Sequence, residues 1–122
     1  MGTYKTDRTA EDIRREIMSV IRNLKDPRIS GYLISVSRIE LARDLSYAKV
    51  YISALEGIDI SLRAVAALTN ATGLIRREIG SKIRIRKIPE LKFIADNSIQ
   101  QGMEIVERMN ILGKDKENSD EN

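Results

Sequence analysis

The chain has 122 residues, of which 42% are hydrophobic, and its 21 lysines and arginines against 18 aspartates and glutamates leave a formal net charge of +3. We expect one soluble, cytoplasmic domain with a modest core, since no apolar run approaches the roughly 20 residues of a membrane span and the start MGTYKTDRTAED lacks the apolar middle of a secretory signal. Cysteine and histidine are absent, which excludes disulfides, thiol nucleophiles and the usual zinc ligands.

The first predicted element is an amphipathic helix that begins near Thr9 and ends before Pro27. Thr9 with Asp12 is typical of a helix N-cap, and apolar residues then recur at helical spacing. These apolar residues are Ile13, Ile17, Val20, Ile21 and Leu24. Arg14, Arg15 and Arg22 lie off this stripe, and we expect them to form an ordinary solvated face, with a role in nucleic-acid binding left open.

The next two segments predict a β-hairpin. The stretch LISVSRIEL (33–41) is rich in β-branched residues but slips phase between Val36 and Ile39, which indicates a β-bulge. The stretch YAKVYISA (47–54) alternates, so that Ala48, Val50 and Ile52 share one face.

Residues 58–79 return to helical spacing, with Gly73 inside the pattern. A straight helix of this length would span about 33 Å, longer than so small a domain needs. We therefore expect a bend, with Gly73 supplying the backbone freedom.

The remaining chain predicts a strand, a helix and a tail. KIRIRK (82–87) alternates like a strand, Pro89 interrupts it, and LKFIA (91–95) resumes it with Phe93 in the core. Ser98 with Gln101 predicts the cap of a last helix that ends at Gly113. Residues 113–122 are polar, with two lysines against four acidic residues, and we expect a disordered tail.

Positive charge is concentrated between residues 76 and 92. This segment holds seven basic residues against Glu78 and Glu90. The basic residues are Arg76, Arg77, Lys82, Arg84, Arg86, Lys87 and Lys92. Such a patch attracts phosphate, although outward lysines and arginines also protect an edge strand from aggregation.

Four stretches of the chain together carry a family likeness: LKDPR (24–28), SRIELARDLSYAKVYIS (37–53), ATGLIRREI (71–79) and IRIRKIPELKFIADNSI (83–99). In their order and spacing, from about residue 9 to residue 113, the chain resembles the bacterial ribosome-binding factor A family. The resemblance implies an α+β, type II KH-like RNA-binding domain over residues 1–112. Its expected order is helix, strand, strand, kinked helix pair, strand, helix, with the helices packed on a three-stranded sheet.

The same resemblance implies a function. It implies a monomer that binds the free 30S ribosomal subunit and its 16S rRNA, assists late maturation and 16S rRNA processing, and is linked to growth in the cold. It implies neither catalysis nor a metal or cofactor.

The resemblance also bears on the glycine in the long helix. An ordinary KH domain clamps nucleotides with a GxxG loop, which this chain lacks. The family instead places an Ala-x-Gly kink there, matched by Ala71, Thr72 and Gly73. With only four tyrosines and one phenylalanine, recognition should depend on phosphate, sugar and RNA shape. The predicted RNA-binding residues are Asn70, Ala71, Thr72, Gly73, Arg76, Arg77, Lys82, Arg84, Arg86 and Lys87.

Two other function classes stay open at this point. One is a module that docks to a ribosomal or other protein through an exposed edge strand. The other is a metal-dependent nuclease that uses Asp44, Asp59 or Asp96, although these three aspartates stand apart in the sequence and a hard cation needs clustered carboxylates.

Overall fold

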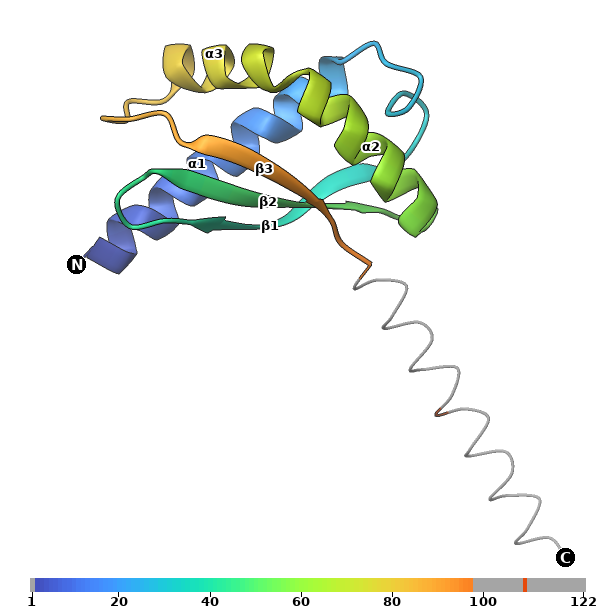
Figure 1. Cartoon of the computed structure of the whole chain (residues 1–122), viewed down its shortest axis with the longest axis horizontal. Coiled ribbons are helices and arrows are strands. Elements are labelled where there is room, and N and C mark those ends of the chain that lie inside the picture. The colour runs from blue at the N-terminus through green and yellow to red at the C-terminus, as the bar shows by residue number, and fades with distance from the viewer. Residues whose placement is uncertain (1, 98–108, 110–122) are drawn as a thin grey trace, which may run out of the picture.

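The computed structural model describes residues 2–97 and residue 109, and these form an α+β fold with its elements in the predicted order (Figure 1). The predicted last helix, 98–113, and the predicted tail, 113–122, lie outside the described residues except for Met109. The elements are α1 (Gly2–Asn23), β1 (Ile34–Leu41), β2 (Tyr47–Ala54), α2 (Ile58–Asn70), α3 (Thr72–Lys82) and β3 (Glu90–Ala95).

The three strands form one mixed sheet in the order β1-β2-β3. β1 and β2 are an antiparallel hairpin, whereas β3 runs parallel to β2 and starts with Glu90 opposite Tyr47. Parallel neighbours need a crossover connection, which α2 and α3 supply (Figure 1). Ala48, Val50 and Ile52 are fully buried, which confirms the predicted inward face of β2.

One hydrophobic core lies between the helices and the inward face of the sheet. It includes Ile13 and Ile17 of α1, Leu68 of α2, Ile75 of α3 and Phe93 of β3. Phe93 is 9% exposed, so its assignment to the core is confirmed. None of the helices in the described part is by itself long and apolar enough to cross a membrane.

The predicted β-bulge is confirmed in β1. Val36 is opposite Ile52, but the pairing then shifts so that Arg38 is opposite Tyr51. An extra residue in one strand reverses its alternation. As a result Ile39, opposite Val50, packs against the same core as Val36.

α1 begins at Gly2, so the predicted start at Thr9 was wrong. No proline lies between residues 2 and 23, and once a helical turn exists each further residue adds one hydrogen bond. Arg8 is therefore helical and lies two turns before Arg15 on the same helix.

The expected bend is present, but Gly73 does not make it. α2 and α3 meet at an angle of 69°, and the residue between them is Ala71, whose N–H donates to the carbonyls of Ala67 and Leu68. The Thr72 hydroxyl donates to the carbonyl of Thr69 (2.7 Å). Gly73 belongs to the first turn of α3 and has no positive φ. A helix end stabilised by Ala71 and Thr72 needs no glycine there.

The predicted strand KIRIRK was wrong, whereas LKFIA is confirmed within β3. Lys82 ends α3, and residues 83–89 are irregular. A strand needs a partner strand, and β2 offers none before Tyr47, which already pairs with Glu90. The carbonyls of Ile88 and Pro89 instead accept hydrogen bonds from the Arg76 guanidinium, at 3.0 Å and 3.3 Å.

Replacing Gly73 with alanine should stabilise the protein by about 0.5 kcal/mol, because a helical conformation suits alanine and the unfolded chain loses freedom. A Cβ at this position would meet no heavy atom within 4 Å. Thermal denaturation of Gly73→Ala against the parent protein measures the effect. A lower melting temperature would show that the bend does require glycine.

Replacing Arg76 with glutamine should destabilise the protein by about 1 kcal/mol, because the two carbonyls that it holds lose a charged donor. The side chain of the neighbouring Arg77 is exposed and has no hydrogen bond or ion pair in the described part of the chain. Arg77→Gln is therefore the matched control and should change stability by less than about 0.5 kcal/mol. Urea denaturation compares the two variants. Equal stabilities would contradict a structural role for Arg76.

Candidate nucleic-acid interface

Five of the six predicted basic residues fall into two groups in the structure. The side chains of Arg77, Arg84 and Arg86 are exposed and make no hydrogen bond or ion pair within the residues that the structure describes. Arg76 and Lys82, by contrast, are held by other groups of the protein. The exposed arginines are therefore the ones whose charge is directly available to an external anion.

Lys82 links α3 to α1. Its Nζ lies 3.1 Å from a carboxylate oxygen of Glu78 and 3.2 Å from one of Glu16. The hydrogen bond to Glu78 and then the contact with Glu16 raise the pKa of Lys82 above its usual 10.5. A raised lysine pKa means that the stability contributed by the Lys82 charge is fully present below pH 10.5 and is lost only as the pH rises through the raised value. At neutral pH, much of the Lys82 charge is therefore offset by its two partners.

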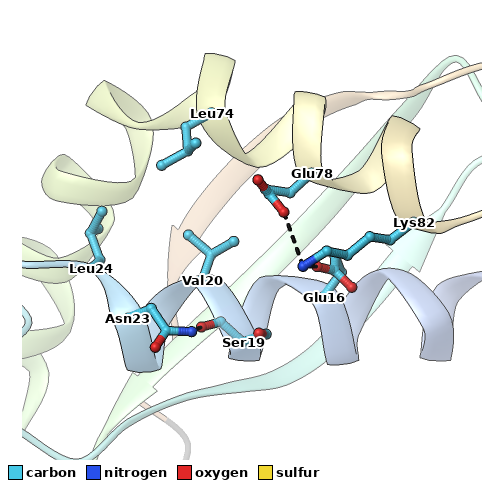
Figure 2. A pocket seen from close by; sticks show the side chains of 8 residues that line it. All are labelled: Glu16, Ser19, Val20, Asn23, Leu24, Leu74, Glu78 and Lys82. Carbon is cyan, nitrogen blue, oxygen red and sulfur yellow. Dashed lines mark hydrogen bonds and ion pairs between the residues drawn. The ribbon is translucent and has the colours of Figure 1, made fainter.

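Figure 2 shows this bridge at the edge of a hollow between α1 and α3. The hollow has a volume of about 200 Å³. Val20, Leu24 and Leu74 form its apolar part, whereas Lys82 reaches across it between Glu78 and Glu16. The bridge thus links the two helices on this side of the core.

Lys87 lies beside the β1–β2 turn. The side chain and backbone N–H of Ser46 donate hydrogen bonds to the carboxylate of Asp44, at 2.7 Å and 3.1 Å. These bonds, and more weakly the positive charge of Lys87, lower the pKa of Asp44. Lys87 therefore has one acidic neighbour but no ion pair shorter than 4 Å within the described residues.

The predicted residues at the helix junction lie at the far end of α3 from the basic segment. Asn70 and Gly73 are exposed, and no side chain caps the N-terminus of α3. The N-terminal amides of a helix favour anions, although the C-terminus of α2 meets α3 here and its partial negative charge opposes that effect. Since α3 has 11 residues, its ends are about 15 Å apart. The predicted residues thus form an elongated surface along α3, not one point.

The arginines of α1 differ in their environments. Arg14 donates from Nε to the carbonyl of Val36 (3.2 Å) and from Nη1 to Glu11 (3.3 Å), so it serves the contact with β1. Arg22 is exposed near the C-terminus of α1 and lines a hollow with residues 29–34. Arg15 instead lies near the basic segment, in a hollow that Arg84 also lines.

Arg8 also lines that hollow and was missed by the sequence analysis. The predicted helix started one residue after it, so its position on the same face as Arg15 was not visible. A helix start at Gly2 would have revealed the spacing of seven residues between the two arginines.

The aspartates of the nuclease hypothesis lie on separate parts of the fold. Asp44 accepts hydrogen bonds from Ser46 within its own turn, and Asp96 accepts one from the Ser37 hydroxyl (2.6 Å). Asp59 lies in the first turn of α2. Within the part of the chain that the structure describes, no three acidic side chains are grouped to hold a metal ion. The geometry therefore offers no support for a nuclease.

Comparison with known proteins gives one consistent family. The family model of ribosome-binding factor A matches residues 5–109. Ribosome-binding factor A of Clostridium tetani is 41% identical over 121 residues, which cover 98% of this chain and 97% of the relative. The Acetivibrio thermocellus protein is 42% identical over 107 residues, or 87% of this chain and 86% of the relative.

Solved structures agree with these sequence matches. The crystal structure of ribosome-binding factor A from Thermus thermophilus has a TM-score of 0.64 at 26% identity, covering 74% of this chain and 93% of that one. A Thermus thermophilus homology model, fitted into a cryo-EM map of a complex of the factor with 30S, has a TM-score of 0.58 at 27% identity, covering 70% and 89%. Both structures share the α+β, KH-like arrangement of this chain, which belongs to the ribosome-binding factor A family.

Proposed function

We propose that this protein binds the free 30S ribosomal subunit through its 16S rRNA and assists late maturation of the subunit, including 16S rRNA processing. The observation that carries the proposal is the exposed basic surface of α3 and the segment that follows it, in a member of the ribosome-binding factor A family. A related protein has been fitted into the map of a 30S complex.

Phosphate is the ligand chemistry that best suits this surface. Arg77, Arg84 and Arg86 place guanidinium groups in solvent without internal partners in the described part of the chain. Guanidinium forms strong, often bidentate hydrogen bonds with phosphate. Contacts of this kind position a protein on a nucleic-acid backbone without reading its bases. We therefore assign Arg77, Arg84, Arg86 and Lys87 to RNA binding, with Asn70 to Gly73 extending the contact to the junction of α2 and α3.

In this proposal the protein contributes to subunit maturation by binding RNA and not by catalysing a reaction. The chain has neither cysteine nor histidine, the residues that most often act as nucleophile and general base near neutral pH. We propose a monomeric cytoplasmic assembly factor that acts by occupying and remodelling rRNA, with a role in growth in the cold, and that uses neither metal nor cofactor.

A protein-docking module is the second candidate, and β3 is the edge that would serve it. The outer edge of β1 is partly occupied by α1, because the Val36 N–H donates to the Met18 sulfur and the Val36 carbonyl accepts from Arg14. β3 pairs with β2 alone in the described sheet. An extended peptide could add to such an edge through backbone hydrogen bonds, and that binding would depend only weakly on salt.

The purified protein should pellet with isolated 30S subunits and much less with 50S subunits or assembled 70S ribosomes. Mixtures are centrifuged through a sucrose cushion at low salt, and the protein in each pellet is measured. Equal recovery with 30S and 50S would indicate unspecific attraction to RNA and would refute the proposal.

Binding to 30S subunits should weaken steeply with salt, by a slope of about −0.7 to −0.9 in log affinity per phosphate neutralised. Replacing Arg84 and Arg86 with glutamine should make this slope shallower by about 2. The matched control is Arg22→Gln with Lys25→Gln, two exposed basic residues at the C-terminal end of α1 and beyond. Its slope should equal that of the parent protein. An unchanged slope for the Arg84 and Arg86 variant would favour docking through β3.

A further inference from the structure

A hollow of about 550 Å³ lies between the N-terminal half of α1 and the end of α3 with its following segment. α1 contributes Arg8, Thr9, Asp12, Arg15 and Glu16, and the other side contributes Lys82, Ile83, Arg84 and Ile85. The hollow therefore joins two parts of the chain that are about 70 residues apart in the sequence. Its size is in the range of sites that hold small ligands or part of a larger one.

Three arginines line this hollow with little internal compensation. The side chains of Arg8 and Arg84 have no hydrogen bond or ion pair within the described residues. Arg15 has only a long contact of 3.7 Å with Glu11, and its side chain is 73% exposed. An exposed pair of that kind contributes little to stability. The three guanidinium groups are thus available for an external partner.

The acidic residues of the hollow do not cancel this charge. Glu16 is paired with Lys82 at 3.2 Å, and Lys82 is shared with Glu78 at 3.1 Å, which does not line the hollow. Among the lining residues, the four basic side chains still outnumber Asp12 and Glu16, and no ion pair shorter than 4 Å joins Asp12 to the three arginines in the described structure. Arginines lining one hollow from both walls repel one another unless an anion lies between them.

The position of the arginines suits an extended polyanion. Arg8 and Arg15 are seven residues apart on one helix, which separates them by about 10 Å along its axis. Arg84 faces them from the other wall. The hollow has no aromatic lining on which a base could stack and contains no glycine-rich loop. It is therefore suited to backbone phosphates more than to a nucleotide base.

We propose that this hollow is a second phosphate-binding site, in which Arg8 and Arg15 of α1 and Arg84 hold a segment of RNA backbone. The inference rests on the proposed binding to 16S rRNA and extends that contact from α3 to α1. Lys82 has a positioning role, because its bridge to Glu16 and Glu78 keeps the two walls of the hollow together. The Thr9 hydroxyl is a further donor at the same place.

The test removes the two arginine charges that α1 contributes to the hollow and leaves the segment after α3 unchanged. Arg8→Gln with Arg15→Gln keeps side chains of good helix propensity, and both positions are exposed, so circular dichroism and thermal melting should match the parent protein. Binding to 30S subunits and to a protein-free 16S rRNA fragment is measured across a salt series. The matched control is again Arg22→Gln with Lys25→Gln, which removes two positive charges at and just beyond the other end of α1.

We expect the Arg8 and Arg15 variant to lose affinity on the order of tenfold at low salt and to show a slope shallower by about 2, with the control unchanged. Adding Arg84→Gln to this variant should then reduce affinity by a smaller factor than it does in the parent protein, because the effects of substitutions at residues that share one ligand are not additive. Inorganic phosphate at millimolar concentration should compete only weakly, because the proposed ligand is a polyanion that offers several phosphates to the arginines at once.

Each contrary result has a distinct meaning. If the Arg8 and Arg15 variant binds like the parent protein while Arg84→Gln with Arg86→Gln binds weakly, the hollow is not a phosphate site and the proposed function stands. If inorganic phosphate alone displaces the protein from RNA at low concentration, the hollow is a small-anion site and the RNA assignment is wrong. If the parent protein binds neither 30S nor the rRNA fragment, the proposed function itself is wrong, whatever the hollow binds.

Discussion

The parallel pairing of β3 with β2 determines how the second half of the molecule is arranged. The chain leaves β2 at Ala54 and must return to start β3 beside Tyr47, at the opposite end of the same strand. Only a long crossover can do this, and a straight helix over residues 58–82 would overshoot the sheet. The 69° bend at Ala71 and the irregular segment 83–89 are the consequences. That segment carries the exposed Arg84 and Arg86, so the constraint on the sheet also places the proposed RNA surface.

Basic residues in this protein divide between holding the fold and facing solvent. Arg14 supports the edge of β1, Arg28 forms a compact turn with Asp26, and Arg76 holds the carbonyls before β3. Lys82 joins two helices. The number of basic residues in the sequence is therefore larger than the number of side chains that can bind an external phosphate. On the proposed RNA surface, the charge that stays available comes from Arg77, Arg84, Arg86 and Lys87 and, across the hollow, from Arg8 and Arg15 of α1.

Both walls of the proposed phosphate site combine basic residues that bind other groups of the protein with basic residues that face solvent. A bridge whose lysine stays charged throughout the neutral range holds α1 against α3, and hydrogen bonds from Arg76 hold the segment that carries Arg84. The anion-binding side chains themselves have no such restraints. Internally paired charges thus link the elements that carry the site, and the unpaired charges on these elements remain free to adjust to an RNA backbone.

The sequence by itself determined the element types, the bulge after Val36, the inward face of β2 and the presence of a bend, because these follow from local periodicity and turn chemistry. It misplaced the start of α1 and assigned the bend to Gly73, although helix propagation and the hydrogen bonds of Ala71 and Thr72 decide these two features. It also made a strand of KIRIRK, which depends on a neighbour that is distant in sequence. Alternation in KIRIRK indicates a strand only where a partner strand exists, and the tertiary structure offers none there. Only the tertiary structure decided that Arg76 and Lys82 bind other groups of the protein. It also decided that Arg8 and Arg15 lie opposite Arg84. The reason is that contacts between charged groups depend on distances in space, which the spacing of residues along the sequence does not encode.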